Sequence, residues 1–445
     1  MKISALTPYA LWFSVTITVL AGCNGGALTS TGAPSQGTRQ SAPRSAFPEQ
    51  IQEAVSHYYV VNLGTLGGKI SGAEGINNRG WISGYAFRRG DNVYRATLWA
   101  SGRKSDLGTL GGPNSDVPFP VKNDRGVIAG LSEVSQTDPY AEDFCGTGTS
   151  HICLGFRWRN GVMTPLPTLG GNNGQANGVN NHGQVVGYTE TNTQDPSCQA
   201  PQVFNYYGAI WQPNGRVQSL PPAAGDSISA ALAANDSGQL VGASGICASP
   251  GYSTAVHALL WQAGSTIDLG NLGGTLDNGA TAINAAGKIV GVSGVAGNAT
   301  FHAFLWQSGV MSDLGTLPGD FSSAAYGINN KGQVVGASCD QSGNCRAFLW
   351  QNGSMTDVNN LTPPDSPLYV FQGADISDRG WIVGDAIDPK TGKSPAVLLI
   401  PSGKADVTPR AAPVRKITLP ESVKAQLRRP EHFRPFLLRR PTTPS

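Results

Sequence analysis

Cysteines are the residues of this 445-residue sequence whose chemistry is easiest to predict. Six of its seven cysteines lie in the central part of the chain: Cys145, Cys153, Cys198, Cys247, Cys339 and Cys345. No two of them have the two-residue spacing and partner His or Cys pair of a zinc site, so we expect no bound metal. An even number of cysteines in an exported chain favours disulfides. The first two could close one loop and the last two another, whereas Cys198 and Cys247 could join neighbouring repeats.

Groups for acid–base catalysis are sparse in the same region. Asp138, Glu142, Asp143 and His151 lie near one another in the sequence, but all four come from a single repeat of the chain. Catalysis would need paired acid and base groups that face one pocket. The sequence also lacks His-Glu-x-x-His, Gly-x-Ser-x-Gly and Gly-x-x-x-x-Gly-Lys-Ser/Thr. We therefore expect no catalytic residue and no cofactor, and an enzyme is the weaker hypothesis.

The first 22 residues are typical of a signal peptide. Lys2 precedes an apolar stretch, Tyr9 to Leu20, that is too short to span a bilayer. The segment ends in Leu20-Ala21-Gly22-Cys23, which resembles the lipobox of bacterial lipoproteins. The resemblance implies that the Cys23 thiol is diacylated and that Cys23 becomes the mature N-terminus.

The residue after Cys23 is Asn24 rather than Asp. By resemblance to proteobacterial lipoproteins, this implies a cell-envelope protein sorted to the outer membrane, on its periplasmic or its surface-exposed side. Residues 23–57 are rich in Gly, Ser, Thr, Ala and Pro, with little that could be buried. They are predicted to form a flexible linker, so that the lipid provides the contact with the membrane.

The composition excludes several classes of protein. A net charge of +2 argues against a nucleic-acid binder, which needs a concentrated basic surface. With 58 Gly and 13% charged residues the chain cannot be a long coiled coil, and 40% hydrophobic residues exclude overall disorder. A large β-rich body with many turns is expected.

An internal repeat organises the chain between the linker and the C-terminal tail. Its pattern is Asp-Leu-Gly-x-Leu-Gly-Gly, then Ile-Asn-x-x-Gly-x-Val-Val-Gly, a variable stretch, and an apolar hexamer that ends in Trp. It occurs seven times, and its turn glycines are Gly80, Gly126, Gly183, Gly238, Gly287, Gly332 and Gly380. The spacing averages about 50 residues, which is typical of propellers and other repeat architectures.

Each repeat is predicted to form four short strands, here a to d. Asn-x-x-Gly between two apolar runs indicates a hairpin, and the hexamer is apolar on both faces, as in a buried strand. Tyr59 to Gly64 has the pattern of a strand d, but no pattern of strands a to c precedes it. The seventh repeat, in contrast, has strands a to c and ends after its strand c at Ile400. The first strand would therefore close the last sheet. This predicts an all-β, seven-bladed β-propeller of four-stranded antiparallel blades over residues 58–402.

The repeats resemble a known family. His302-Ala303-Phe304-Leu305-Trp306 and its equivalents, together with Leu-Gly-x-Leu-Gly-Gly and Ile-Asn-x-x-Gly, are similar to the HAF repeat of bacterial extracellular proteins. The match covers roughly three quarters of the chain. It implies a secreted or surface-attached β-propeller without an assigned biochemical role, and it brings no catalytic residues.

The connections between strands b and c vary most in length and carry all six central cysteines. In a propeller these connections emerge on one face together with the d-to-a connections. Irregular loops held by disulfides on a rigid scaffold are common places for binding residues. The candidates for a binding face are Tyr140, Asp143, Phe144, Phe204, Tyr206 and Tyr207. Drift in loop length, with disulfides added for stability alone, explains the pattern equally well.

The tail, residues 403–445, is basic and rich in Pro. From Lys404 onward it carries ten Lys and Arg and only three acidic residues. We expect it to be mostly disordered, although Pro420 to Arg429 could form a short helix. It could attach to anionic lipid or polysaccharide, or serve only as a solvated extension.

Two functions remain after this reading. One is a monomeric, non-catalytic binding module whose ligand is a protein or a glycan on the cysteine-bearing face. The alternative is an extracellular propeller hydrolase or lyase with a site at the channel mouth. Carboxylates from several blades at that mouth would favour the enzyme.

Overall fold

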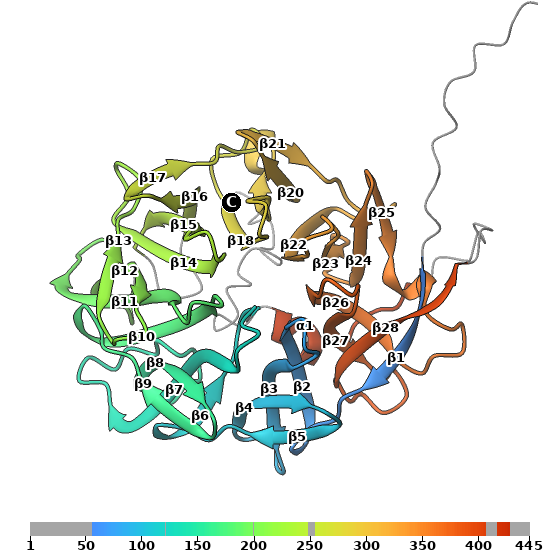
Figure 1. Cartoon of the computed structure of the whole chain (residues 1–445), viewed down its shortest axis with the longest axis horizontal. Helices are drawn as coiled ribbons and strands as arrows, with labels where there is room; N and C mark the ends of the chain where they lie inside the picture. The colour runs from blue at the N-terminus through green and yellow to red at the C-terminus, as the bar shows by residue number, and fades with distance from the viewer. Residues whose placement is uncertain (1–55, 121, 199, 248–253, 406–415, 428–445) are drawn as a thin grey trace, which may run out of the picture. The chain divides into compact units, whose positions relative to one another are not determined.

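The computed structural model describes residues 56–120, 122–198, 200–247, 254–405 and 416–427. The described chain forms seven four-stranded antiparallel sheets, arranged as the blades of a β-propeller (Figure 1). The predicted fold class is confirmed. The predicted signal peptide, Cys23, nearly all of the linker and most of the basic tail lie outside the described residues. No described helix is long and apolar enough to cross a membrane.

Blades 1 to 4 follow one another along the chain. Their strands, in order from the channel outward, are β2 (Gly67–Ile76), β3 (Ile82–Arg88), β4 (Tyr94–Ala100), β5 (Arg103–Asp106), β6 (Gly111–Asp116), β7 (Val127–Thr137), β8 (His151–Arg159), β9 (Val162–Pro165), β10 (Gly170–Val179), β11 (Val185–Gln194), β12 (Phe204–Trp211), β13 (Val217–Leu220), β14 (Ile228–Ala234), β15 (Leu240–Ile246), β16 (Thr254–Gln262) and β17 (Ser265–Asp268).

Blades 5 to 7 have the same order, and three short helices accompany them. The elements are β18 (Gly279–Ile283), β19 (Ile289–Gly294), η1 (Ala296–Asn298), β20 (Phe301–Gln307), β21 (Val310–Asp313), β22 (Ser322–Ile328), β23 (Val334–Cys339), β24 (Cys345–Gln351), β25 (Ser354–Asp357), η2 (Val358–Leu361), β26 (Tyr369–Ile376), β27 (Ile382–Ile387), β28 (Ala396–Ala405) and α1 (Glu421–Leu427).

Blade 7 is completed by the first strand of the described chain, β1 (Ser56–Asn62). This strand pairs antiparallel with β28, and Tyr59 lies opposite Ile400 while Val61 lies opposite Leu398. The pairing confirms the closure predicted from the orphan strand. It also leaves no open edge between the first and last blades, where another chain could add a strand.

The Asn-x-x-Gly turn is stabilised by its own side chain. In blade 1 the Asn77 Oδ1 accepts hydrogen bonds from the main-chain N–H groups of Arg79 and Trp81, both at 3.0 Å. Gly80 has a φ of 80°, which is disfavoured for residues with a Cβ. Asn and Gly therefore both stabilise the hairpin between strands a and b, and in blade 7 the Ser377 hydroxyl replaces the Asn side chain by accepting from the Trp381 nitrogen.

The second glycine of the repeat has a different role. A Cβ built on Gly336 of β23 would lie 2.0 Å from the Ala324 carbonyl oxygen of β22. The two strands approach so closely beside a register shift between Ala325 and Gly327 that no side chain fits. Equivalent close contacts occur at Gly84, Gly130, Gly187, Gly242, Gly291 and Gly384.

Strand c is buried on both faces, as expected. In blade 5, Ala303 and Phe304 are fully buried on opposite sides of β20. The Trp at the end of the strand also binds the connection from the preceding blade, since Trp211 Nε1 donates to the Pro167 carbonyl at 2.7 Å and Trp261 Nε1 to that of Pro221 at 2.8 Å. The repeated Trp thus joins consecutive blades.

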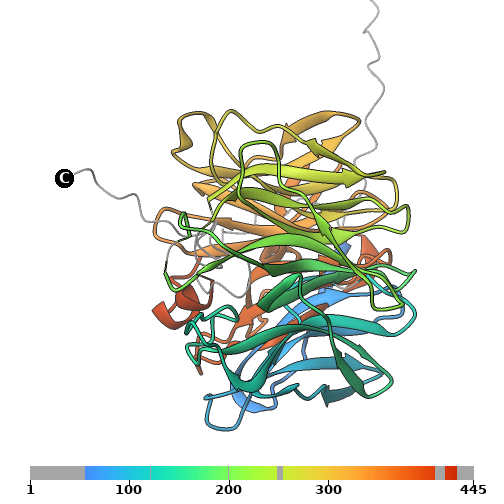
Figure 2. The same cartoon turned by 90° about the vertical axis from the view of Figure 1, so that its left-hand side faces the viewer.

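The propeller has two unlike faces. We call the one with the b-to-c and d-to-a connections the loop face, and the one with the Asn-x-x-Gly and c-to-d turns the turn face. Helix α1 lies on the loop face, on the same side as the connection between β7 and β8 (Figure 2). The most extensive apolar cluster of the molecule also includes residues of α1 and of the disulfide-bearing loops.

Candidate functional site

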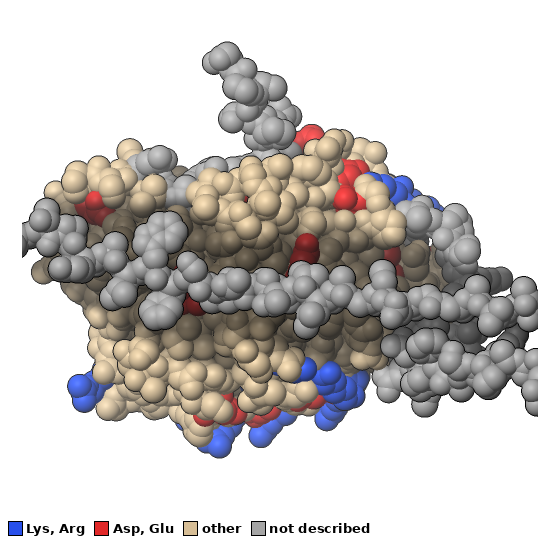
Figure 3. Space-filling view, turned by 90° about the horizontal axis from the view of Figure 1, so that it is seen from above, with Lys and Arg blue, Asp and Glu red and all other residues tan. Residues whose placement is uncertain are grey.

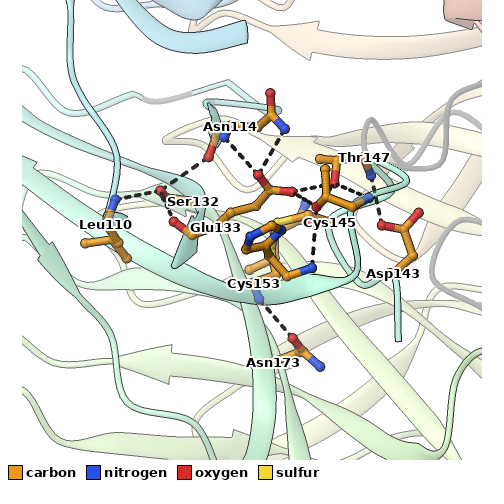
Figure 4. The surroundings of a disulfide bond; sticks show 12 residues. Leu110, Asn114, Ser132, Glu133, Asp143, Cys145, Thr147, Cys153 and Asn173 are labelled. Carbon is orange, nitrogen blue, oxygen red and sulfur yellow. Dashed lines mark hydrogen bonds between the residues drawn. A yellow bond between two sulfur atoms is a disulfide. The ribbon is translucent and has the colours of Figure 1, made fainter. Parts of the chain in front are cut away.

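All three predicted disulfides are present, and all lie on the loop face. Cys145–Cys153 closes the connection between β7 and β8 (Figure 4), and Cys339–Cys345 joins β23 to β24. Cys198–Cys247 links blade 3 to blade 4 across a sequence separation of 49 residues. The loops predicted to carry binding residues are therefore covalently fixed to the scaffold.

A buried carboxylate holds the first of these loops from below. Glu133 Oε2 accepts hydrogen bonds from the main-chain and side-chain nitrogens of Asn114, both at 2.9 Å. Its Oε1 accepts from the hydroxyls of Thr147 and Thr149, on the far side of the Cys145–Cys153 bond (Figure 4). Glu133 thus ties the loop to strand β6 as well as to its own strand.

Three further carboxylates meet beneath the loops of blades 2 and 3. The amide nitrogen of Asn173 lies 2.9 Å from Asp138 Oδ2 and 3.2 Å from one oxygen each of Glu142 and Glu190. Gln202 Nε2 lies 2.8 Å from Glu190 Oε1 and 3.3 Å from Glu142 Oε1. Burial, followed by the charge of Glu142, raises the pKa of Glu190 to about 8. The Glu190 carboxyl is therefore protonated near neutral pH.

Glu142 connects the two loops directly. Its Oε1 accepts hydrogen bonds from the main-chain N–H groups of Val203 at 2.6 Å and Phe204 at 3.2 Å, so that a side chain of blade 2 positions the backbone of blade 3. Burial raises the pKa of Glu142, while these backbone donors act in the opposite direction. Glu142 was a sequence candidate for catalysis, but its side chain is fully buried and acts as a structural anchor.

The predicted binding-face residues divide into three groups. Tyr140 is 46% exposed and packs edge-on against Phe204, with ring centroids 5.1 Å apart. Phe144 and Tyr206 are 2% and 1% exposed, and both rings pack against Tyr188. Contrary to the expectation of a binding surface, these last two are core residues, because both rings are buried in the apolar cluster that also contains the disulfide cysteines and Leu419.

Asp143 and Tyr207 take intermediate positions. Asp143 Oδ1 accepts hydrogen bonds from the main-chain nitrogens of Thr147 at 3.1 Å and Gly148 at 3.0 Å, which makes it a turn-forming residue. Tyr207 lies on β12 opposite Thr189 and is partly exposed. The solvent-accessible part of the candidate face is thus centred on the Tyr140–Phe204 pair.

Carboxylates from several blades do meet at the channel, but at its mouth on the turn face. A cavity of about 90 Å³ is lined there by Asp124, Asp236 and Asp378, from blades 2, 4 and 7. Asp236 accepts from the main-chain and side-chain nitrogens of Asn181 at 2.7 and 3.0 Å. Hydrogen bonds also reach Asp124 Oδ1 from the nitrogen of Asn78 at 2.9 Å. These carboxylates link neighbouring turns.

A buried ion pair adjoins the channel mouth. Asp375 is fully buried and pairs with Lys122, whose Nζ also donates to the Ile376 carbonyl at 2.9 Å. The second carboxylate oxygen of Asp375, Oδ2, accepts a hydrogen bond from the main-chain nitrogen of Ile76 at 2.9 Å. Burial raises the pKa of Asp375, and Lys122 opposes that shift. Blades 1, 2 and 7 are joined at one point, which the sequence did not reveal because the three segments are far apart in the chain.

The described part of the tail packs against the loop face. Leu419 and Val423 are buried in the same apolar cluster as Cys339 and Cys345. The Leu419 nitrogen donates to Asn344 Oδ1 at 2.9 Å, and Lys416 Nζ lies 3.0 Å from Asp340 Oδ2. The short helix considered from the sequence is present as α1, and this segment, unlike the expected disordered tail, has a defined place.

Comparisons with known proteins give no family for this chain. No family model and no curated protein matches it. Solved structures with similarity include a gluconolactonase from Xanthomonas campestris (10% identity, 77% of this chain and 89% of that chain, TM-score 0.34) and a streptogramin B lyase (9%, 77% and 97%, 0.43). A puromycin-hydrolyzing peptidase from Mycobacterium tuberculosis also matches (11%, 78% and 56%, 0.41). None of these assigns an activity to this chain.

Proposed function

We propose that this protein is a lipid-anchored β-propeller of the cell envelope that acts as a non-catalytic binding module. Its ligand is a protein or a glycan, bound on the loop face that carries the three disulfides. The anchor is the lipid on Cys23, and the linker sets the distance between the propeller and the membrane.

The observation that carries this proposal is the rigid support beneath the exposed ring of Tyr140 and the half-buried ring of Phe204. Cys145–Cys153 and Cys198–Cys247 fix the two loops, and Glu142 bonds one loop to the main chain of the other. Rigid aromatic side chains lose little conformational entropy on binding, which favours them as contact residues. Aromatic rings also stack on sugars or pack in protein interfaces.

The alternative, a hydrolase or lyase, is favoured by two observations. First, carboxylates from blades 2, 4 and 7 meet at the channel mouth on the turn face, although each of them accepts a hydrogen bond from an Asn of a neighbouring turn. Second, the neighbouring carboxyl groups of Glu142 and Glu190 both have raised pKa values, a feature common in active sites. Both side chains are fully buried, however, and their oxygens are occupied by hydrogen bonds from Asn173, Gln202 and the loop backbone. A substrate has no access to them in this arrangement, so the binding module is the better supported function.

A binding experiment separates these possibilities. The purified protein is applied to arrays of glycans and cell-surface polymers, beside a Tyr140→Ala variant. Tyr59→Ala is the matched control, because Tyr59 is 57% exposed on the outer strand β1. We expect saturable binding that Tyr140→Ala weakens by about tenfold and that Tyr59→Ala preserves.

Two results would overturn the proposal. Equal binding by wild type and Tyr140→Ala would remove the loop face from consideration. Turnover of an array ligand that Glu190→Gln abolishes would favour the enzyme. The anchor is tested separately with a Cys23→Ser variant, which is expected to lose labelling by a radioactive fatty acid.

A further inference from the structure

Blade 2 departs from the other blades at one site on strand c. In blade 2, Arg157 precedes Trp158 and Arg159 follows it. In the other six blades, the residue before the last residue of the hexamer is Leu or Ile, and the residue after it is Gln, Ala or Ile. The equivalent pairs are Leu98 and Ala100, Ile210 and Gln212, Leu260 and Gln262, Leu305 and Gln307, Leu349 and Gln351, and Leu398 and Ile400. Most of the apolar members are buried. Blade 2 thus has a charge where its repeats have an apolar contact, and such local violations of a pattern mark functional sites.

The two arginines lie on the same side of their blade. Residues two apart on a strand face the same way, and the register places Arg157 beside Thr164 and Arg159 beside Val162 of β9. Arg157 also donates to the Pro213 carbonyl of blade 3 at 3.2 Å. Both arginines line a groove of about 430 Å³ that lies between the turns of blades 2 and 3.

Two more basic groups complete the groove. Arg125 comes from the Asn-x-x-Gly turn of blade 2, and His182 comes from that of blade 3. His182 Nε2 is 3.1 Å from the Asp236 carbonyl, which orients the ring. Four basic side chains from two blades therefore line one groove, together with the Thr164 hydroxyl.

The charge of this groove is not neutralised by the described protein. Among the ion pairs of the described residues, none includes Arg125, Arg157 or Arg159. The surrounding turn face carries further basic residues, Arg79, Arg103, Arg216, Lys288, Lys331 and Arg379, beside the carboxylates Asp124, Asp236 and Asp378 of the channel mouth. In the edge-on view of Figure 3, most of the visible Lys and Arg lie along one face. Three arginines line this groove, and its lining includes no carboxylate, which indicates a site for an anion.

We propose that the groove between blades 2 and 3 binds a phosphate or sulfate ester carried on a saccharide. Guanidinium groups donate paired hydrogen bonds that match the oxygens of such anions, and a doubly charged ester suits three arginines better than a single carboxylate. The volume accommodates a sugar-sized group beside the ester. This site is on the turn face, so it is independent of the ligand proposed for the loop face.

The test uses the purified protein and defined probes. Binding of glucose 6-phosphate, inorganic phosphate, inorganic sulfate and glucose is measured by calorimetry. The double variant Arg157→Leu/Arg159→Gln restores the residues of the other repeats, so it is expected to fold with an equal or higher Tm. The matched control, Arg79→Gln/Arg216→Gln, removes the same charge elsewhere on the turn face. We expect saturable binding of glucose 6-phosphate, weakened about tenfold or more by the first variant and within about twofold of wild type in the control.

The outcomes are decisive in either direction. If both double variants weakened the binding of glucose 6-phosphate equally, the proposal would be overturned. That result would mean that the overall positive charge of the turn face attracts the anion and that the groove is not a specific site. Absence of binding to every phosphate and sulfate probe would also overturn it. Vesicles of phosphatidylcholine with or without phosphatidic acid distinguish the source of the ester. Groove-dependent binding to the anionic vesicles alone would replace the saccharide by a lipid headgroup. Failure of this test leaves the Tyr140 experiment unaffected.

Discussion

The side-chain amide of Asn180 donates a hydrogen bond to the main-chain carbonyl of Asn235, 3.1 Å away across the boundary between blades 3 and 4. The same link joins the equivalent turn residues from Asn77 through Asn329 to Ser377. Neighbouring blades meet at seven boundaries around the channel, and at six of them the equivalent Asn side chain makes this hydrogen bond. At the seventh boundary, Ser377 has no side-chain amide that could donate to the main-chain carbonyl of Asn77.

Replacing one member of this ring should weaken the whole propeller. Asn235 Oδ1 accepts from the main-chain nitrogens of Ser237 and Gln239, both at 3.1 Å, and its amide reaches Asn284. Asn235→Ala leaves these buried groups without a partner and should lower the free energy of unfolding by about 2–3 kcal/mol. Ser377→Asn should raise it by about 1 kcal/mol by supplying the missing step. Urea unfolding measures both, and an unchanged midpoint for Asn235→Ala would refute the role of the ring.

The Glu142–Glu190 pair should make stability depend on pH. The pKa of Glu190 is raised to about 8 in the folded protein, from 4.5 in the absence of burial and of the nearby Glu142 charge. The folded state therefore holds a proton that the unfolded state releases, and its stabilising effect is present below pH 4.5 and is lost as the pH rises towards 8.

The measurement is chemical unfolding across that range of pH. The free energy of unfolding of the wild-type protein should fall by on the order of a few kcal/mol between pH 4.5 and pH 8. Glu190→Gln, which keeps the shape but does not titrate, should show a flatter dependence. If the two proteins had parallel pH profiles, the proton would not reside on this pair.

The three disulfides should contribute unequally. Cys198–Cys247 closes a segment with a separation of 49 residues, and Cys339–Cys345 closes one of 6. Loop-closure entropy predicts a loss of about 4 kcal/mol for Cys198→Ala/Cys247→Ala and about 2 kcal/mol for Cys339→Ala/Cys345→Ala. Thermal unfolding of the two double variants compares them. A larger loss at the short loop would mean that packing around Cys339 dominates.

The close approach of strands a and b makes Gly336 essential. Gly336→Ala would place a Cβ 2.0 Å from the Ala324 carbonyl oxygen, and relieving that contact requires the strands to separate. We expect a loss of about 3 kcal/mol or more, or no folded protein. Gly353→Ala is the control, since Gly353 has a φ of 79° but open space around it, and it should cost about 1 kcal/mol. Similar losses for both would show that backbone conformation, not strand contact, is the cause.

Removal of the C-terminal segment should expose part of the apolar interior. Leu419 is 2% and Val423 1% exposed in the cluster that includes Cys339 and Cys345. A chain ending at residue 405 should show a lower Tm and increased fluorescence of an apolar dye. Leu419→Ala should produce part of the same effect. An identical Tm for the shortened chain would mean that α1 adds no stability to the propeller.

The sequence by itself determined the blade and the number of blades. The Asn-x-x-Gly turns, the hexamer that is apolar on both faces and the orphan strand at Tyr59 are local patterns, and local hydrogen bonding and burial select the strands they predict. The disulfide partners were also correct, because regular repeats constrain which loops are neighbours. The recurrence of Asn77 and its equivalents in the repeats was interpreted only as a turn signal, although the same side chains also join the blades.

Tertiary structure decided which side chains are accessible and which charges meet. Phe144 and Tyr140 are four residues apart in one loop, yet Phe144 is buried in the apolar cluster with Tyr188 and Tyr206, whereas Tyr140 is 46% exposed. Glu142 and Glu190 come from different blades, and only their burial in one cluster lets the charge of Glu142 raise the pKa of Glu190. Arg125, Arg157 and His182 form one groove since two adjacent blades bring separate turns together. Such contacts depend on the packing of distant segments, which no local pattern encodes.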